Sequence, residues 1–181
     1  MIQHLSLLNP FIRIDDEATA RAAARGGAVA LLIGAASMVF GIIYLLSSPE
    51  TITSAMEAGM ANAAATDPEA AKMAEAMLPA LLNFSMMFNG VLAAVMLVLA
   101  VIQWRKMTGT IPLIFLLLCG LGALSMVWAL MMTATGMAPK VPVPVPPLQV
   151  WIGRIIMLLQ ILLFISAYRG GSFLARAGKP A

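Results

Sequence analysis

Four long apolar stretches constrain the fold of this chain more than any other feature of its sequence. They cover residues 26–46, 81–104, 111–133 and 148–168, and Arg154 is the only Asp, Glu, His, Lys or Arg among them. A helix of about 20 apolar residues crosses the hydrocarbon core of a bilayer. Such segments are helical because lipid offers no partners for backbone amides. The sequence therefore predicts an all-α integral membrane protein with four transmembrane helices.

The composition excludes an ordinary soluble domain. Of the 181 residues, 61% are hydrophobic and 10% are charged. A soluble domain carries about 25% charged and about 45–50% apolar residues, so this chain lacks the polar surface to cover itself in water. Cys119 is the only cysteine, which excludes a disulfide scaffold within the chain.

The spans are expected to pair as two antiparallel hairpins, the first with the second and the third with the fourth. Only residues 105–110 separate the second span from the third, so we also expect these two helices to lie tightly antiparallel. The predicted division is an apolar cytoplasmic arm, 1–15; helix one, 16–47; an extracytoplasmic helical loop, 48–80; helix two, 81–104; a short cytoplasmic loop, 105–110; helix three, 111–133; a proline-rich extracytoplasmic strap, 134–147; helix four, 148–168; and a basic cytoplasmic tail, 169–181.

The basic residues predict the orientation. Lys72 and Lys140 are the basic residues of the loops on one side, whereas eight lie on the other: Arg13, Arg21, Arg25, Arg105, Lys106, Arg169, Arg176 and Lys179. The positive-inside rule places the richer side in the cytoplasm. We therefore expect both termini to be cytoplasmic, with the protein in a bacterial inner membrane.

A cleaved signal peptide is the alternative interpretation of the N-terminal region. It requires a basic segment followed by 7–15 apolar residues, whereas here Asp15, Asp16 and Glu17 precede a span of about 20. A retained first helix is favoured, with Asp15 as its N-cap. The apolar arm before it is expected to lie on the inner membrane surface or against a partner.

The first extracytoplasmic loop is expected to form a helical hairpin. Apolar residues recur with helical spacing over residues 52–63. A second helix is expected to begin near Thr66, either with Thr66 and Glu69 as a capping box or with Asp67 as the N-cap before Pro68. Pro79 predicts a kink in this helix. The methionines of this loop are interpreted as packing onto the membrane surface rather than as a docking face. Copper(I) ligation is not favoured, because the loop contains neither His nor Cys.

Five prolines between residues 138 and 149 predict an extended strap. A rigid spacer between spans three and four is favoured over a proline-motif ligand, because the cytosolic readers of that motif would not reach the outer face.

Four polar residues of the spans are the candidate ligand or lipid contacts: Arg154, Gln160, Asn89 and Gln149. An ionisable group inside a membrane indicates function by default. Arg154 lies near the outer end of its helix, however, where snorkelling to headgroups is the favoured interpretation. Gln160 and Asn89 are candidates to bond each other, and such pairs between helices are more often structural than ligand-binding.

Small residues spaced four apart predict close helix packing. They are Gly26, Ala30 and Gly34 in the first span and Gly90 and Ala94 in the second. Small side chains at this spacing let helix backbones approach one another, within one bundle or between chains.

Two functions of different classes follow from these features. The first is a non-catalytic accessory or scaffold subunit of a larger membrane assembly, and the second is a small homo-oligomeric channel, transporter or lipid-binding protein. No span contains Asp, Glu or His, and His4 is the only histidine, so no catalysis, cofactor or metal is expected. The expected partners are membrane lipids and other membrane subunits or copies of this chain, not nucleic acid. The four-span layout alone does not define a function.

Overall fold

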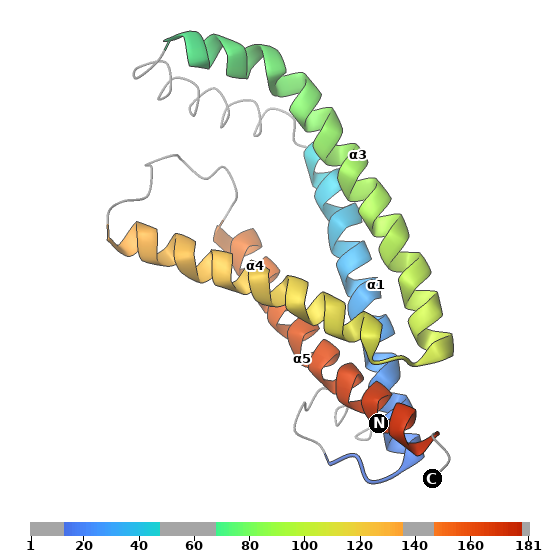
Figure 1. Ribbon diagram of the computed structural model, residues 1–181. Helices are drawn as coiled ribbons and strands as arrows, with labels where there is room; N and C mark the ends of the chain where they lie inside the picture. Colours follow the sequence, from blue (N-terminus) through green and yellow to red (C-terminus); the bar gives the residue numbers. More distant parts are fainter. Residues whose placement is uncertain (1–12, 48–67, 136–146, 179–181) are drawn as a thin grey trace.

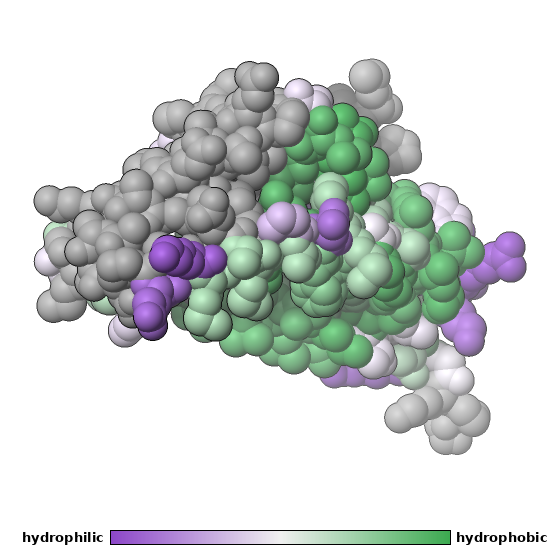
Figure 2. Space-filling view, turned by 90° about the horizontal axis from the view of Figure 1, so that it is seen from above, coloured by the Kyte–Doolittle hydropathy of each residue, from purple (hydrophilic) through white to green (hydrophobic). Residues whose placement is uncertain are grey.

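The computed structural model describes residues 13–47, 68–135 and 147–178, which form helices and no strand (Figure 1). Each of its four helices is long and apolar enough to cross a membrane. Figure 2 shows hydrophobic residues over much of the described part of one face, with few hydrophilic residues among them. The prediction of an all-helical chain with four membrane-length helices is confirmed, and it indicates an integral membrane protein. The helices are α1 (Glu17–Ser47), α3 (Pro68–Lys106), α4 (Thr110–Ala134) and α5 (Pro147–Ala177).

The helix α1 is central to the packing. It lies along both α3 and α5, and α4 packs on α5. The buried core combines small residues of α1 and α3 with larger side chains of α1, α4 and α5: Ala28, Ala30, Ala100, Leu31, Phe115, Leu163 and Phe164. The rings of Phe115 on α4 and Phe164 on α5 stack with their centroids 5.7 Å apart. Together these contacts join all four helices through α1 and α5.

Glycines bring the C-terminal half of α5 very close to its neighbours. A Cβ on Gly170 would lie 2.5 Å from the carbonyl oxygen of Ala20, and one on Gly171 would lie 2.5 Å from the backbone nitrogen of Gly109. No side chain fits at either position without moving backbone. As a result, the start of α1, the end of α3 and the end of α5 gather at one end of the molecule (Figure 1).

The helices α3 and α4 diverge from their short connection, residues 107–109 (Figure 1). Met107 has a left-handed backbone with φ of 50°, and its N–H donates to the carbonyl of Gln103 at 2.9 Å, a common way to end a helix. The expected tight pairing of spans two and three is therefore wrong. The buried side chains of α4 explain the difference, because Phe115 packs on α5 and Pro112 lies beside α1 at Gly27.

Several element boundaries differ from the prediction. α3 is continuous from Pro68, so the end of the predicted external loop and the second span form one helix that contains Pro79. Figure 1 shows the first turns of α3 bent away from the rest of the helix. α5 runs from Pro147 to Ala177 and includes most of the predicted tail. The arm up to residue 12, the loop helix of residues 52–63, the caps at Thr66 and Asp67, and most of the strap lie outside the described residues.

The start of α1 also differs by one residue from the prediction. Asp16, not Asp15, is the N-cap, because its Oδ1 accepts the backbone N–H of Thr19 at 2.6 Å. Asp15 instead pairs with Arg13, with 2.9 Å between Oδ1 and Nε. The helix begins at Glu17, so Asp16 directly precedes it and occupies the position from which a side chain caps the N–H of the third helical residue, Thr19.

Candidate functional site

A partly enclosed cavity of about 360 Å³ lies among the four helices and is the candidate functional site. Most of its lining is apolar, and its polar groups are two side-chain amides, a hydroxyl and a thiol. Ligand sites commonly combine an apolar wall with a few polar groups. The lining residues are Gly34, Ser37, Met38, Gly41, Leu45, Asn89, Met96, Phe115, Cys119, Gln160 and Phe164.

Gln160 is held in this lining by a hydrogen bond to another helix. Its Nε2 donates to the backbone carbonyl of Ala30 on α1 at 3.1 Å. Gly34 makes room for this amide, because a Cβ there would lie 2.8 Å from Nε2 and 2.9 Å from Sδ of Met96. The Oε1 atom of Gln160 accepts no hydrogen bond from the described residues, so it remains available to a molecule in the cavity.

Asn89 lines the same cavity but bonds within its own helix. Its Nδ2 donates to the backbone carbonyl of Ser85 at 2.9 Å and lies 3.5 Å from the Ser85 hydroxyl. The expected pair between Gln160 and Asn89 is therefore not formed. Each amide uses a helix carbonyl instead, because such a carbonyl can accept a second hydrogen bond from a side chain.

Arg154 does not join this cavity. Its guanidinium carbon lies 4.9 Å from the ring centre of Trp151, and its buried Nε has no hydrogen-bond partner among the described residues. Gln149 lies in the first turn of α5, where its side chain is outside the described part. Thus, of the four polar candidates, the structure brings only Asn89 and Gln160 to one cavity.

The two sets of small residues behave differently. Gly26, Ala30 and Gly34 are buried on α1, and a Cβ on Gly26 would meet Leu163 of α5 at 3.6 Å. Ala94 is exposed, and a Cβ on Gly90 would meet nothing within 4 Å. Gly90 and Ala94 therefore do not pack on another helix within residues 13–47, 68–135 and 147–178, because α3 turns a neighbouring face toward the core, on which Ala93 and Ala100 are buried.

Gln103 is a buried polar residue that the sequence analysis missed. Its Nε2 donates to the carbonyls of Ala24 on α1 and Thr108 in the connection, both at 3.0 Å. Its Oε1 accepts the Thr108 hydroxyl at 3.3 Å. The available signal was an amide in the last turn of an apolar span, which must find a partner when buried.

The fold and the cavity place this chain in a class of small all-helical proteins whose four long helices can cross a membrane. No family model, curated protein or solved structure matches the chain.

Proposed function

We propose that this protein is a non-catalytic accessory or scaffold subunit of a larger membrane assembly. The observation that carries the proposal is the divergence of α3 and α4 (Figure 1), two of the helices that line the partly open cavity. A transmembrane helix of a partner subunit is the proposed occupant of the space between these two helices.

Three glycines without neighbours support this role. A Cβ on Gly41, Gly90 or Gly120 would meet nothing within 4 Å. Gly41 lines the cavity, and the other two each follow a lining residue, Asn89 and Cys119. Helices associate in membranes through small residues that let backbones approach. Glycines that pack on nothing in the described part of this chain are therefore suited to receive a helix from another chain.

Gly90→Leu tests this role, with Gly153→Leu as the matched control. A Cβ on Gly153 also meets nothing within 4 Å, but Gly153 is not adjacent in sequence to a cavity-lining residue. Native mass spectrometry after gentle extraction is expected to show different, heavier subunits with the wild type and Gly153→Leu. Gly90→Leu is expected to leave without them. The proposal fails if the wild-type chain leaves alone or only with copies of itself.

The predicted N-terminal arm gives a second test of the same role. Deleting residues 2–12 is expected to weaken retention of partner subunits, because this apolar segment is proposed to lie against a partner or the membrane surface. If the full set of partners remains bound, the arm makes no contribution to assembly.

The proposed location is a bacterial inner membrane with both termini in the cytoplasm. The gathering of basic residues at one end of the bundle supports this orientation: Arg21, Arg25, Arg105, Lys106, Arg169 and Arg176. In a Cys119→Ser background, a membrane-impermeant maleimide should label Lys72→Cys in spheroplasts. Arg176→Cys should react only after lysis, and the reverse pattern would overturn the orientation.

The alternative function is a small homo-oligomeric channel, transporter or lipid-binding protein. The convergence of Asn89 and Gln160 on one cavity favours it. Under this function, the double variant Asn89→Leu/Gln160→Leu should lose flux or ligand binding. Arg154→Ala should retain it, since Arg154 stacks on Trp151 away from the cavity lining. Unchanged flux and ligand binding in the double variant would exclude this alternative.

A further inference from the structure

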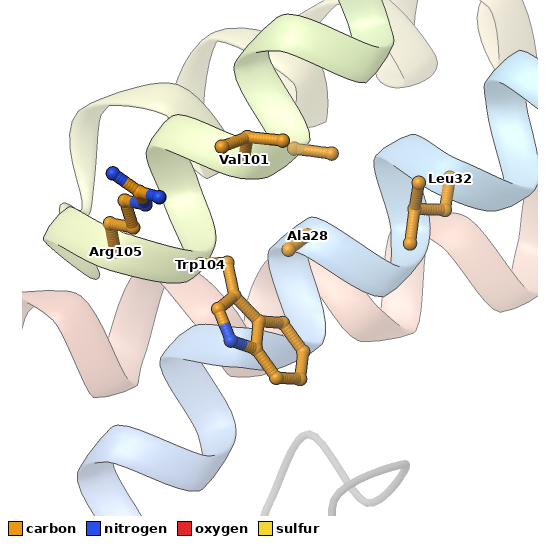
Figure 3. A pocket seen from close by; sticks show the side chains of 6 residues that line it. Ala28, Leu32, Val101, Trp104 and Arg105 are labelled. Atoms are coloured by element: carbon orange, nitrogen blue, oxygen red, sulfur yellow. The ribbon is translucent and has the colours of Figure 1, made fainter.

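A second hollow lies between α1 and α3, at the end of the molecule where the basic residues gather. It is an open groove of about 170 Å³ (Figure 3). Ala28 and Leu32 come from α1, and Ala100 and Val101 come from α3. Trp104 and Arg105 complete the lining toward the end of α3. This groove shares no lining residue with the cavity described above.

The surface of the groove is apolar, and the cationic groups lie beside its end. Leu32 and Val101 are apolar and about half exposed. One turn closer to the end of the bundle, Trp104 extends from α3 toward α1 beside Ala28 (Figure 3). Arg105 follows on α3, and Arg25 of α1 lies with its guanidinium carbon 5.3 Å from the Trp104 ring centre. Tryptophan is favoured at the level of lipid headgroups.

The two arginines beside the groove have no carboxylate partner among the described residues. The ion pairs at this end join Arg13 with Asp15 and Arg21 with Glu17. A guanidinium that stacks on a ring through its face keeps its N–H donors for other groups. Arg25 and Arg105 therefore carry positive charge that the described chain does not neutralise, at the end of an apolar groove.

We propose that this groove binds an anionic phospholipid. An acyl chain lies along Leu32 and Val101, and the phosphate-bearing headgroup lies between Arg25 and Arg105 beside Trp104. The apolar wall, the indole and the guanidinium groups follow one another along the groove in the same order as the acyl chain, the interfacial region and the anionic headgroup of such a lipid. The site does not depend on the proposed subunit role, because it uses none of the residues proposed to receive a partner helix.

The test compares removal of the two groove arginines with an equal loss of charge elsewhere at the same end. The site variant is Arg25→Gln/Arg105→Gln, and the control is Arg13→Gln/Arg176→Gln. All four side chains are exposed, so the fold is expected to persist in both. The full-length protein in detergent is titrated with phosphatidylglycerol or with phosphatidylcholine of the same acyl chains, and bound lipid is counted by native mass spectrometry.

The wild type and the control pair are expected to retain phosphatidylglycerol in preference to phosphatidylcholine. The site variant should bind phosphatidylglycerol roughly thirtyfold more weakly, because each of the two arginines contributes about 1 kcal/mol of attraction to anionic lipid and every 1.4 kcal/mol is tenfold in affinity. Equal retention of both lipids by the wild type, or an equal loss in the control pair, would overturn the proposal.

Val101→Trp supplies a second, independent measurement. Val101 is 56% exposed, so a larger side chain there fills the groove without entering the core. Retention of phosphatidylglycerol is expected to fall although every arginine remains. If Val101→Trp binds this lipid as the wild type does, the acyl chain does not occupy the groove and the proposal is wrong.

Discussion

The side-chain amide of Gln160 donates to the backbone carbonyl of Ala30, 3.1 Å away, and so joins α5 to α1 near the middle of both helices. The same amide lines the cavity among the four helices. Gly34, one turn beyond Ala30, leaves the space that the amide occupies. Gln160 and Gly34 therefore take part both in the packing of α1 on α5 and in the wall of the candidate site.

Gln160→Leu should lower the free energy of unfolding by a small amount. It removes one hydrogen bond between helices, a loss that averages about 0.6 kcal/mol in membrane proteins. Asn89→Leu is the matched control, because the amide of Asn89 bonds only within α3. In mild detergent, the melting temperature of Gln160→Leu should be lower than that of Asn89→Leu. Equal stability of the two would mean that the bond to Ala30 does not contribute to the folded state.

Gly34→Ala should destabilise the protein by about 1 kcal/mol, the lower end of the range for overpacking. The new methyl group would meet the ends of two flexible side chains, Gln160 and Met96, which can move aside. Gly90→Ala, where the methyl group meets nothing within 4 Å, should be at least as stable as the wild type, because alanine is the better helix former. Denaturation of both variants in the same detergent would show the difference. Equal stability of Gly34→Ala and Gly90→Ala would mean that Gly34 does not make room for the side chains of Gln160 and Met96.

Gly170→Ala should lower the free energy of unfolding by about 3 kcal/mol, more than Gly34→Ala or Gly90→Ala. The added Cβ would lie 2.5 Å from the oxygen of Ala20 and 2.8 Å from the nitrogen of Ala24. Both are backbone atoms of α1, so the two helices must separate. A melting temperature close to that of Gly34→Ala would show that α1 and α5 do not approach as closely as described.

Much of the helical framework was predictable from the sequence, because span length and hydropathy are local properties. The four spans required only a count of consecutive apolar residues. The burial of Gly26 and Gly34 on α1 follows from the spacing of small residues along one helix face. The same spacing in α3 has no packing partner among the described residues, since Ala94 is exposed, and its contacts between chains stay a prediction. A motif of small residues shows which face can pack closely, but not which neighbour is present.

The relative placement of the helices was not predictable in the same way. The short connection between α3 and α4 suggested a tight pair, but the left-handed backbone of Met107 and the bonds of Gln103 set the direction of the chain there. Gln160 was expected to meet another side chain and instead meets the backbone of α1. The partner of Gln160 is a backbone carbonyl far away in the sequence, and a partner of Gln103 is a backbone carbonyl in the irregular connection after α3. Hydropathy identifies neither of these partners.

The N-cap interaction of Asp16 at the start of α1 should weaken in acid. Hydrogen bonds from the backbone N–H and the hydroxyl of Thr19 hold the pKa of Asp16 below its usual value of 3.8. A lowered pKa in the folded state means that the cap contributes fully above 3.8 and loses its contribution as the pH falls through the lower folded value. Exchange protection of the Thr19 amide should therefore decrease in acid. Asp16→Asn keeps a capping oxygen without the charge, so protection that falls equally in this variant would exclude Asp16 as the titrating group.

Gln103→Leu should be among the most damaging polar-to-apolar changes, because one fully buried amide joins α1 to the connection between α3 and α4. Leucine would leave the carbonyl of Thr108 and its hydroxyl without this partner, and each buried group left unpaired costs about 1–3 kcal/mol. Thr108→Val removes only the hydroxyl bond to Oε1 and should cost less.

Spin labels at Val98→Cys and Leu117→Cys, both exposed positions, in a Cys119→Ser background would report the separation of α3 and α4. Gln103→Leu should broaden that distance distribution and Thr108→Val should change it little. A narrow, unchanged distribution in Gln103→Leu would mean that the divergence of the two helices is set by their contacts with α1 and α5 alone.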